Sequence, residues 1–299
     1  MNTIKNVFSI KDLENLSGIK AHTIRIWEKR YKLLEPERSE TNIRSYNLIN
    51  LQKLLNISFL NSNGLKISKI ATLNEFEIAK KVNQISFEGD PKNHAVNAFK
   101  LSMLNFDQEL FYTTYNQLLE EKSFREVFYE FFIPLIQQVG VLWQTLTIEP
   151  SHERFFTVHV RQKVLIHIER LQSRNPRPDT KTFVLFLPIN EIHDLGLLFI
   201  NYELLSRGYH TIYLGESIPI SNLNTLNTLY DDVTYISFFT VKPDVEKLDS
   251  YLKTIYNEVL ENTSNTLRVL GTRLKDYNPK KLPKQIDIFS SIESLVKDL

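Results

Sequence analysis

The chain has 299 residues, contains no cysteine and carries a formal net charge of +1. This length suits two or three domains, and the apolar share of 42% and charged share of 24% are those of ordinary globular proteins. The lack of cysteine excludes disulfides, thiolate metal sites and cysteine nucleophiles. No apolar run is long enough to span a bilayer and the first residues lack a signal-peptide pattern, so we expect a soluble, cytoplasmic protein.

The charge is unevenly spread along the chain. Residues 1–70 hold 12 Lys and Arg against 6 Asp and Glu, which gives a local balance of +6. A basic module at the amino terminus is expected of a protein that binds nucleic acid. Charge alone favours a merely soluble surface about equally, so the motifs must decide between the two.

Two short helices are predicted near the amino terminus. Ser9, followed by an acid three residues later, resembles a capping box, and Gly18 is typical of the residue that ends a helix. A second helix is predicted over Ala21–Tyr31 after a very short turn, which makes a helix-turn-helix. Ile24 and Trp27 of this helix are expected to face the core.

The second helix and the residues after it supply the candidate DNA contacts. Three blocks, Thr23–Tyr31, Leu33–Arg38 and Arg44–Tyr46, together resemble the winged-helix signature of MerR-family regulators. This resemblance implies a winged helix-turn-helix over residues 1–75, with a recognition helix and a wing that contacts phosphates. The side chains we expect at the major groove and the phosphates are His22, Thr23, Arg25, Lys29, Arg30, Arg38, Arg44 and Tyr46.

Helical periodicity continues beyond this domain. A third helix is predicted at about Leu48–Asn61 and a fourth from Leu65. Later helices are predicted at about His94–Leu104, Asp107–Glu121, Ser123–Gln144 and Pro150–Gln172. The last four make a four-helix bundle over residues 90–175, in which Pro134 is expected to kink the third helix. Linkers are predicted at residues 87–92 and 174–179, where Gly, Pro and polar residues gather.

From residue 180 to the end, short apolar runs alternate with helices. Strands are predicted at Phe183–Leu187, Thr211–Leu214, Thr234–Phe239, Leu267–Leu270 and Ile286–Phe289. This alternation predicts an α/β domain with a doubly wound parallel sheet of the Rossmann or flavodoxin-like kind, which binds ligands at the carboxyl ends of its strands. We therefore expect a multidomain chain: an all-α winged helix-turn-helix, then a four-helix bundle, then this α/β domain.

The loop after the first of these strands carries the most distinctive motif of the chain. Here His193 follows a carboxylate, Glu191, and precedes Gly196 by three residues. Such a histidine could ligate a metal while the carboxylate fixes its geometry, and the glycine would let a large flat ligand approach the backbone. The motif resembles the Asp-x-His-x-x-Gly element of cobalamin-binding domains, with glutamate in place of aspartate. By that resemblance His193 is the lower ligand of cobalt.

Two further elements resemble the same domains. Ser237, at the end of the third strand, matches a serine whose hydroxyl bonds the nucleotide tail of the cofactor. Gly271 and Thr272, after the fourth strand, stand where the family has a glycine pair that lines the slot for the tail. The side chain of Thr272 departs from that pattern and is expected to narrow the slot.

Two residues of the bundle resemble the element that covers the upper face of cobalamin in light-sensing MerR-type regulators. Trp143 and Glu153 match it, with nine residues between them. Gln144 and Arg154 stand where that family has histidines, which puts a histidine-ligated light state in doubt. Packing of Trp143 at the end of a bundle core is the alternative.

These resemblances together indicate a MerR-type regulator of the CarH/LitR-like adenosylcobalamin photoreceptor kind. They imply a repressor that binds a double-stranded DNA operator as a homodimer or homotetramer and senses adenosylcobalamin and light. The alternative is a MerR-like regulator whose degenerate pocket binds no cobalamin and serves oligomerisation or a protein partner. An enzyme, such as a corrinoid-dependent methyltransferase module, is disfavoured because the chain has no second catalytic domain.

Overall fold

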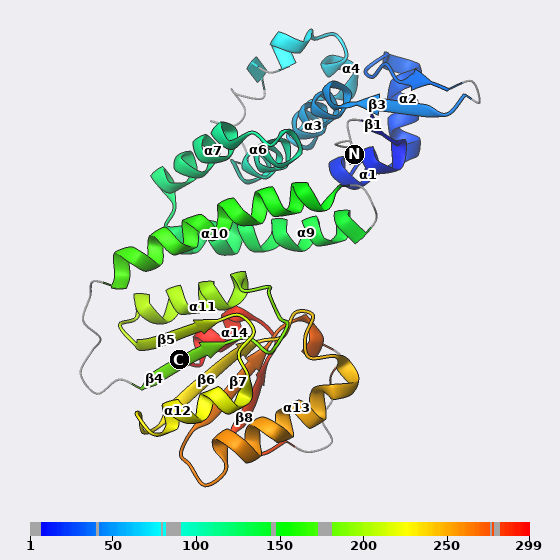
Figure 1. Cartoon of the computed structure of the whole chain (residues 1–299). Helices are drawn as coiled ribbons and strands as arrows, with labels where there is room; N and C mark the ends of the chain where they lie inside the picture. Colours follow the sequence, from blue (N-terminus) through cyan, green and yellow to red (C-terminus); the bar gives the residue numbers. More distant parts are fainter. Residues whose placement is uncertain are drawn as a thin grey trace. The chain divides into compact units, whose positions relative to one another are not determined.

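The computed structural model describes residues 7–39, 42–78, 80–81, 91–144, 148–172, 181–275, 277 and 282–299. The chain forms two compact units, Met1–Val160 and Arg161–Leu299, and Figure 1 labels their elements. The predicted linkers fall mostly outside the described residues, except that Pro91 and Lys92 already belong to a helix. The three domain boundaries expected from the sequence stay predictions.

The first unit begins with the helix-turn-helix and its wing. Its elements are β1 (Val7–Phe8), α1 (Ile10–Ser17), α2 (Ala21–Tyr31), β2 (Glu37–Arg38), β3 (Arg44–Asn47), α3 (Leu48–Ser62) and α4 (Ile67–Ile70). The predicted capping box is present, because Ser9 Oγ accepts from the backbone of Asp12 and the Asp12 carboxylate accepts from Ser9. Gly18 ends α1 with φ of 75°, a conformation that glycine adopts without strain.

Small strands add to the helices expected in this part of the chain. The order β1-β3-β2 makes a three-stranded antiparallel sheet, and β1 was not predicted. The core of the domain includes Ile24, which is 0% exposed, and Trp27, which is 8% exposed, as the sequence predicted. Because these two side chains are buried, the opposite face of α2 points toward solvent.

The rest of the first unit is helical. It contains α6 (Pro91–Asn105), α7 (Gln108–Glu121), α8 (Phe124–Val127), η1 (Phe128–Phe132), α9 (Ile133–Gln144) and the first half of α10 (Pro150–Gln172). Its core is aromatic: the rings of Phe99, Phe111, Phe132 and Phe156 contact one another. A π-helical turn, η1, lies just before Pro134. The backbone nitrogen of Pro134 carries no hydrogen, so it cannot donate to a carbonyl of the preceding turn.

The second unit contains a five-stranded parallel sheet of order β5-β4-β6-β7-β8. Its strands are β4 (Thr182–Phe186), β5 (His210–Gly215), β6 (Val233–Phe238), β7 (Thr266–Leu270) and β8 (Ile286–Phe289). All five lie within one or two residues of their predicted positions. Every residue of β4 is buried, which is typical of a central strand covered on both faces.

Helices cover both faces of this sheet (Figure 1). The face with α11 (Leu195–Ser206) also holds α14 (Ile292–Lys297), and the opposite face holds α12 (Asn224–Asn227) and α13 (Leu248–Ile255). Short turns of helix complete the unit: η2 (Ile220–Leu223), η3 (Val245–Lys247), η4 (Tyr256–Leu260) and η5 (Thr272–Leu274). Because β4 and β6 are neighbours with helices on opposite faces, their carboxyl ends mark the position where ligands bind in such sheets.

Within the described ranges, no helix is both long enough and apolar enough to cross a membrane.

Candidate functional site

The carboxylate of Glu191 is the centre of a hydrogen-bond network at the carboxyl ends of β4 and β6. Its side chain is 0% exposed. Oε1 lies 2.6 Å from Nδ1 of His193 and accepts from the backbone N–H groups of Ile192 and His193, each at 3.0 Å. Oε2 accepts from the backbone N–H groups of Val241 at 2.5 Å and Lys242 at 2.7 Å. One carboxylate therefore joins the loop after β4 to the loop after β6.

This network sets the state of the acid. Burial by itself raises the pKa of Glu191, but the hydrogen bonds from the His193 ring and from the backbone of Lys242, Val241 and His193 outweigh it and lower the pKa from 4.5 to about 2. Glu191 is therefore ionised at neutral pH and can only accept hydrogen bonds. Nδ1 of His193 must then carry the proton that they share, which puts the lone pair of a neutral ring on Nε2.

The surface around His193 is unusually apolar. The histidine side chain is 45% exposed. Ile189 and Ile192 of the same loop are 52% and 49% exposed, and Val241 and Val245 of the loop after β6 are 40% and 53% exposed. Exposed apolar side chains on both loops that Glu191 joins mark a surface that a ligand or partner covers. A flat, largely apolar ligand that takes a bond from His193 fits this surface.

The residue after His193 is held just as firmly. Asp194 is 6% exposed and precedes the first residue of α11. Its carboxylate accepts two close hydrogen bonds from Arg161, from Nε at 3.0 Å and from a terminal nitrogen at 2.8 Å, and Tyr213 lies 3.5 Å away. This pairing raises the pKa of Arg161. The histidine loop is thus fixed from both sides, by Glu191 before it and by Asp194 after it.

The side chains that resemble the lining of a nucleotide-tail slot contact other residues of this chain. Ser237 is 0% exposed, and its hydroxyl donates to the carbonyl of Phe186 at 2.9 Å. A methyl group on Gly196 would lie 2.7 Å from the ring of Phe238, so that ring covers the open face of the glycine. The sequence did not identify Phe238, because it stands at the variable position of its motif.

The glycine after β7 is required by the backbone. Gly271 has φ of 126°, and a methyl group there would lie 2.3 Å from the carbonyl oxygen of Phe239. Thr272 is exposed, and its hydroxyl donates to the carbonyl of Thr240 at 2.8 Å. The residues around His193 therefore fit a flat cofactor that carries its metal. At the slot, a tail would need the ring of Phe238 to move.

The predicted covering residues are placed only in part. Trp143 and Gln144 end α9, and their side chains lie outside the described part of the structure. Glu153 is half-buried in the first turn of α10. His152 is 1% exposed, its Nδ1 accepts from the backbone N–H of Glu149 at 3.1 Å, and its ring stacks on Phe106. His152 is therefore a core residue rather than a stand-in for the histidine missing at Arg154.

No group of three or more His, Cys, Asp and Glu side chains that could hold a bare metal ion occurs among the described residues.

The first unit carries the candidate DNA-binding surface. On α2 the side chains of His22, Arg25, Lys29 and Arg30 are exposed, and that of Thr23 is half-buried. They lie on the face opposite to the buried Ile24 and Trp27. The helix therefore presents a basic face of the kind that enters a major groove.

An unpredicted acid organises the wing. Glu28, on α2, accepts from Arg38 at 3.0 Å, from Nε of Arg44 at 2.9 Å and from the hydroxyl of Tyr46 at 3.2 Å. Tyr46 is 1% exposed, so it belongs to the domain core and not to the surface that was expected to meet phosphates. Glu28 lies inside the motif itself, but its partners are ten to eighteen residues away in sequence, which no local pattern shows.

Comparisons with known proteins define the class. Residues 8–76 match the MerR HTH family regulatory proteins. Residues 95–166, which fall on the helices of the predicted bundle, match the family described as B12 binding domain. The chain is thus a DNA-binding transcriptional regulator in which a MerR helix-turn-helix is joined to a B12 binding domain.

Two repressors of Myxococcus xanthus are similar over most of their length. The HTH-type transcriptional repressor CarH is 24% identical over 286 residues, covering 93% of this chain and 88% of CarH. The HTH-type transcriptional repressor CarA is 23% identical over 252 residues, covering 79% of this chain and 78% of CarA. The monomethylamine corrinoid protein of Methanosarcina barkeri shares the fold, with a TM-score of 0.58 at 11% identity over 69% of this chain and 97% of that one.

The Glu191 network predicts a specific dependence of stability on pH. Because folding lowers the pKa of Glu191 from 4.5 to about 2, its contribution is present above pH 4.5 and is lost as the pH falls toward about 2. The shift corresponds to about 3 kcal/mol. Glu191→Gln is expected to lower the free energy of unfolding by about that amount at pH 7 and by progressively less below pH 4.5, as measured by urea unfolding. The exposed Glu261→Gln serves as control and should change little; a Glu191→Gln deficit that stays constant with pH would contradict this account.

The basic face of α2 predicts a loss of DNA binding on truncation. A duplex is first selected from a random pool by the wild-type protein, and binding is then followed by fluorescence anisotropy. Arg25→Ala is expected to weaken binding to this duplex at least tenfold, because an arginine that contacts a base edge contributes about 1–3 kcal/mol. Lys253→Ala, an exposed change in the second unit, is the control and should bind as the wild type does. Equal affinities for the two variants would place the recognition surface elsewhere.

Proposed function

We propose that this regulator is a repressor that binds its operator as a homodimer or homotetramer, holds adenosylcobalamin against His193 and responds to light. The proposal includes that the chain acts in the cytoplasm and catalyses no reaction. The MerR match, the B12 binding match and the similarity to the repressors CarH and CarA support it. Three of these matches are to transcriptional regulators and the fourth is to a B12 binding domain. The adenosyl form, the response to light and the oligomeric state are the parts of the proposal that go beyond them.

The observation that carries the cofactor assignment is the Glu191–His193 pair. A buried, ionised carboxylate holds Nδ1 of the histidine at 2.6 Å and so directs Nε2 toward a metal. In the proposal His193 is the lower ligand of the cobalt, and Glu191 fixes its tautomer. Gly196 lets the flat cofactor approach the backbone, Ser237 bonds the nucleotide tail, and Gly271 and Thr272 line the slot for it. Trp143 and Glu153 would cover the other face of the cofactor.

When bound, adenosylcobalamin supplies a cobalt–carbon bond that light can break. The chain's own residues turn the state of that ligand into DNA binding: His193 and the apolar loops hold one face, and the bundle residues Trp143 and Glu153 contact the group on the other. A ligand that contacts one assembly better than another shifts the population toward it. If Trp143 and Glu153 contact the group that light releases, its loss would favour the assembly that leaves the operator.

A direct test is retention of the cofactor. Purified protein mixed with adenosylcobalamin in the dark should keep a cobalamin absorption spectrum through gel filtration, and illumination should change both that spectrum and the elution volume. His193→Ala is expected to weaken retention at least tenfold because it removes the metal ligand. His210→Ala, at the amino end of β5 and bonded to Thr182, is the matched control. A wild-type protein that elutes without cobalamin would rule out the sensor.

The second candidate keeps DNA binding and drops the cofactor. In this alternative the α/β domain serves oligomerisation or a protein partner, and the chain again catalyses no reaction. The contact between Phe238 and Gly196 favours it, because the ring lies where the tail slot is expected. The exposed apolar loops around His193 would then be an interface between proteins.

Phe238 allows the two candidates to be separated. If the ring has to move for the tail to enter, Phe238→Ala should bind adenosylcobalamin several-fold more tightly than the wild type. Binding of cobinamide, which lacks the tail, should be unchanged by the same substitution, and this serves as the internal control. Both affinities are measured by absorbance titration in the dark. If neither protein binds either corrinoid, the second candidate stands; equal effects on both ligands would mean that Phe238 does not guard a tail slot.

A further inference from the structure

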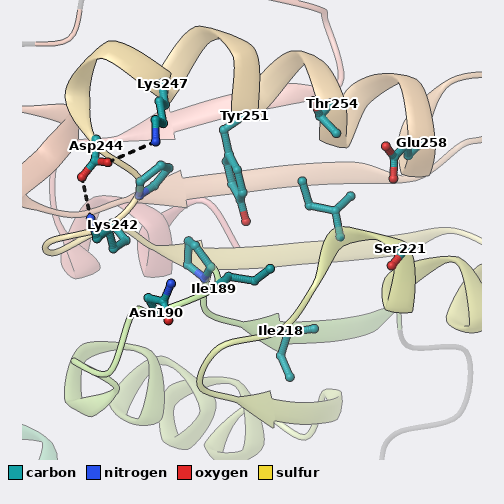
Figure 2. Close-up of a pocket in the computed structure, with 13 residues that line it drawn as sticks. Ile189, Asn190, Ile218, Ser221, Lys242, Asp244, Lys247, Tyr251, Thr254 and Glu258 are labelled. Atoms are coloured by element: carbon teal, nitrogen blue, oxygen red, sulfur yellow. Dashed lines mark hydrogen bonds and ion pairs between the residues drawn. The ribbon is translucent and has the colours of Figure 1, made fainter.

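A second cavity lies at the carboxyl edge of the sheet. It has a volume of about 560 Å³ and is lined by the loops after β4 and β6, by the segment before α12 and by α13 (Figure 2). Its walls are largely apolar and include Ile189, Ile218, Ile220 and Pro243. His193 is not among its lining residues, and α13 covers the face of the sheet opposite to α11. His193 itself therefore lies outside the cavity, although Ile189 of the same loop lines it.

Tyr251 gives this cavity a polar group that lacks a partner. Its side chain extends from α13 into the space between the walls (Figure 2), and its ring packs against Phe239. The hydroxyl is buried and finds no hydrogen-bond partner in the part of the chain that the structure describes. Burial raises the pKa of Tyr251, so the hydroxyl keeps its proton and can donate. An acceptor supplied by a ligand would satisfy it.

The cavity is elongated along the helix. Lys247, Tyr251, Thr254 and Glu258 all line it, at spacings of four, three and four residues, which is one face of a helix. Eleven residues of helix span roughly 16 Å. In Figure 2 the four side chains follow one another along the same side of the helical segment that η3, α13 and η4 form together. A long, narrow ligand fits this shape better than a compact one.

One end of the cavity is positively charged. The ammonium groups of Lys242 and Lys247 lie 2.7 Å and 3.6 Å from the two oxygens of Asp244, so two cations share one carboxylate. The other end holds Glu258 instead. The charge therefore orients a ligand with its anionic group toward Lys247 and the neighbouring Tyr251 hydroxyl, and with its apolar body toward Thr254.

The walls of this cavity also belong to the Glu191 network. Lys242 lines the cavity and donates its backbone N–H to Glu191, and Ile189 lies two residues before that acid. An occupant would contact both loops that Glu191 joins. An occupant would therefore lie against the same loops whose hydrogen bonds to Glu191 orient His193.

We propose that this cavity binds an elongated apolar carboxylate of the medium-chain fatty acid class, and that its occupancy changes the affinity for cobalamin. The carboxylate group lies between the Lys247 ammonium and the Tyr251 hydroxyl, and the chain runs toward Thr254. Binding of the carboxylate stands independently of the cofactor, and only the coupling rests on the proposed function.

Decanoate is the probe, titrated into the full-length protein by calorimetry. Lys247→Gln is expected to weaken binding at least fivefold, whereas Lys253→Gln, which changes an exposed lysine of α13 that does not line the cavity, leaves it unchanged. Tyr251→Phe should weaken binding as well without changing the volume of the cavity. Decanol should bind more weakly than decanoate because it lacks the charge. Equal binding by the two lysine variants, tighter binding of phenylacetate, or no binding of decanoate would overturn the proposal.

The coupling is measured by titrating adenosylcobalamin in the dark with and without saturating decanoate. A change of at least threefold in cobalamin affinity, with both ligands bound, supports the coupling; no change overturns it. Full displacement of decanoate by cobalamin would make the cavity part of the cofactor surface and overturn it as a separate site. If cobalamin fails to bind under all conditions, the proposed function fails while the decanoate result still decides the cavity.

Discussion

Everything at the candidate cofactor site depends on one buried carboxylate. Glu191 accepts hydrogen bonds on both oxygens, from the His193 ring and its loop on one side and from the backbone of Val241 and Lys242 on the other. Aspartate, which the resembling domains have at this position, is shorter by one methylene. The longer side chain lets one oxygen hold the histidine while the other reaches the neighbouring loop. Glutamate in place of aspartate thus links the loop after β4 to the loop after β6.

The sequence predicted most of the architecture because its elements are bounded by strong local signals. The strands of the second unit are short apolar runs between turn residues. Ser9 caps the start of α1, Gly18 caps its end, and α2 ends at Tyr31. It missed β1, because two residues carry no periodicity, and the π-helical turn before Pro134, because its side chains repeat almost as in an α-helix. At the site it identified Glu191 and His193 from their spacing. The partners of Glu28 and the ring that covers Gly196 lie far away in sequence, where only the fold brings them together.

The first unit shows how the bundle and the DNA-binding domain are joined. Lys100, on α6, is 8% exposed, and its ammonium group donates to the carbonyl of Leu16 near the end of α1 at 3.2 Å. Burial lowers the pKa of Lys100 to about 8. Lys100 is buried and moves with α6, while its bond holds the end of α1. A displacement of α6 is therefore transmitted to the helix-turn-helix or breaks this bond. Either outcome links the bundle to the position of α2.

The two loops that Glu191 joins carry three features at once: the histidine, an exposed apolar rim and one wall of the second cavity. Such a shared wall has a physical consequence. Glu191 is sealed from water and ionised, and any movement of the Val241–Lys242 backbone leaves one of its oxygens without a donor, which is costly for a buried charge. The loops therefore move together with His193 or not at all. In the proposed coupling, a ligand on either side of this wall would act on the same small set of hydrogen bonds to Glu191.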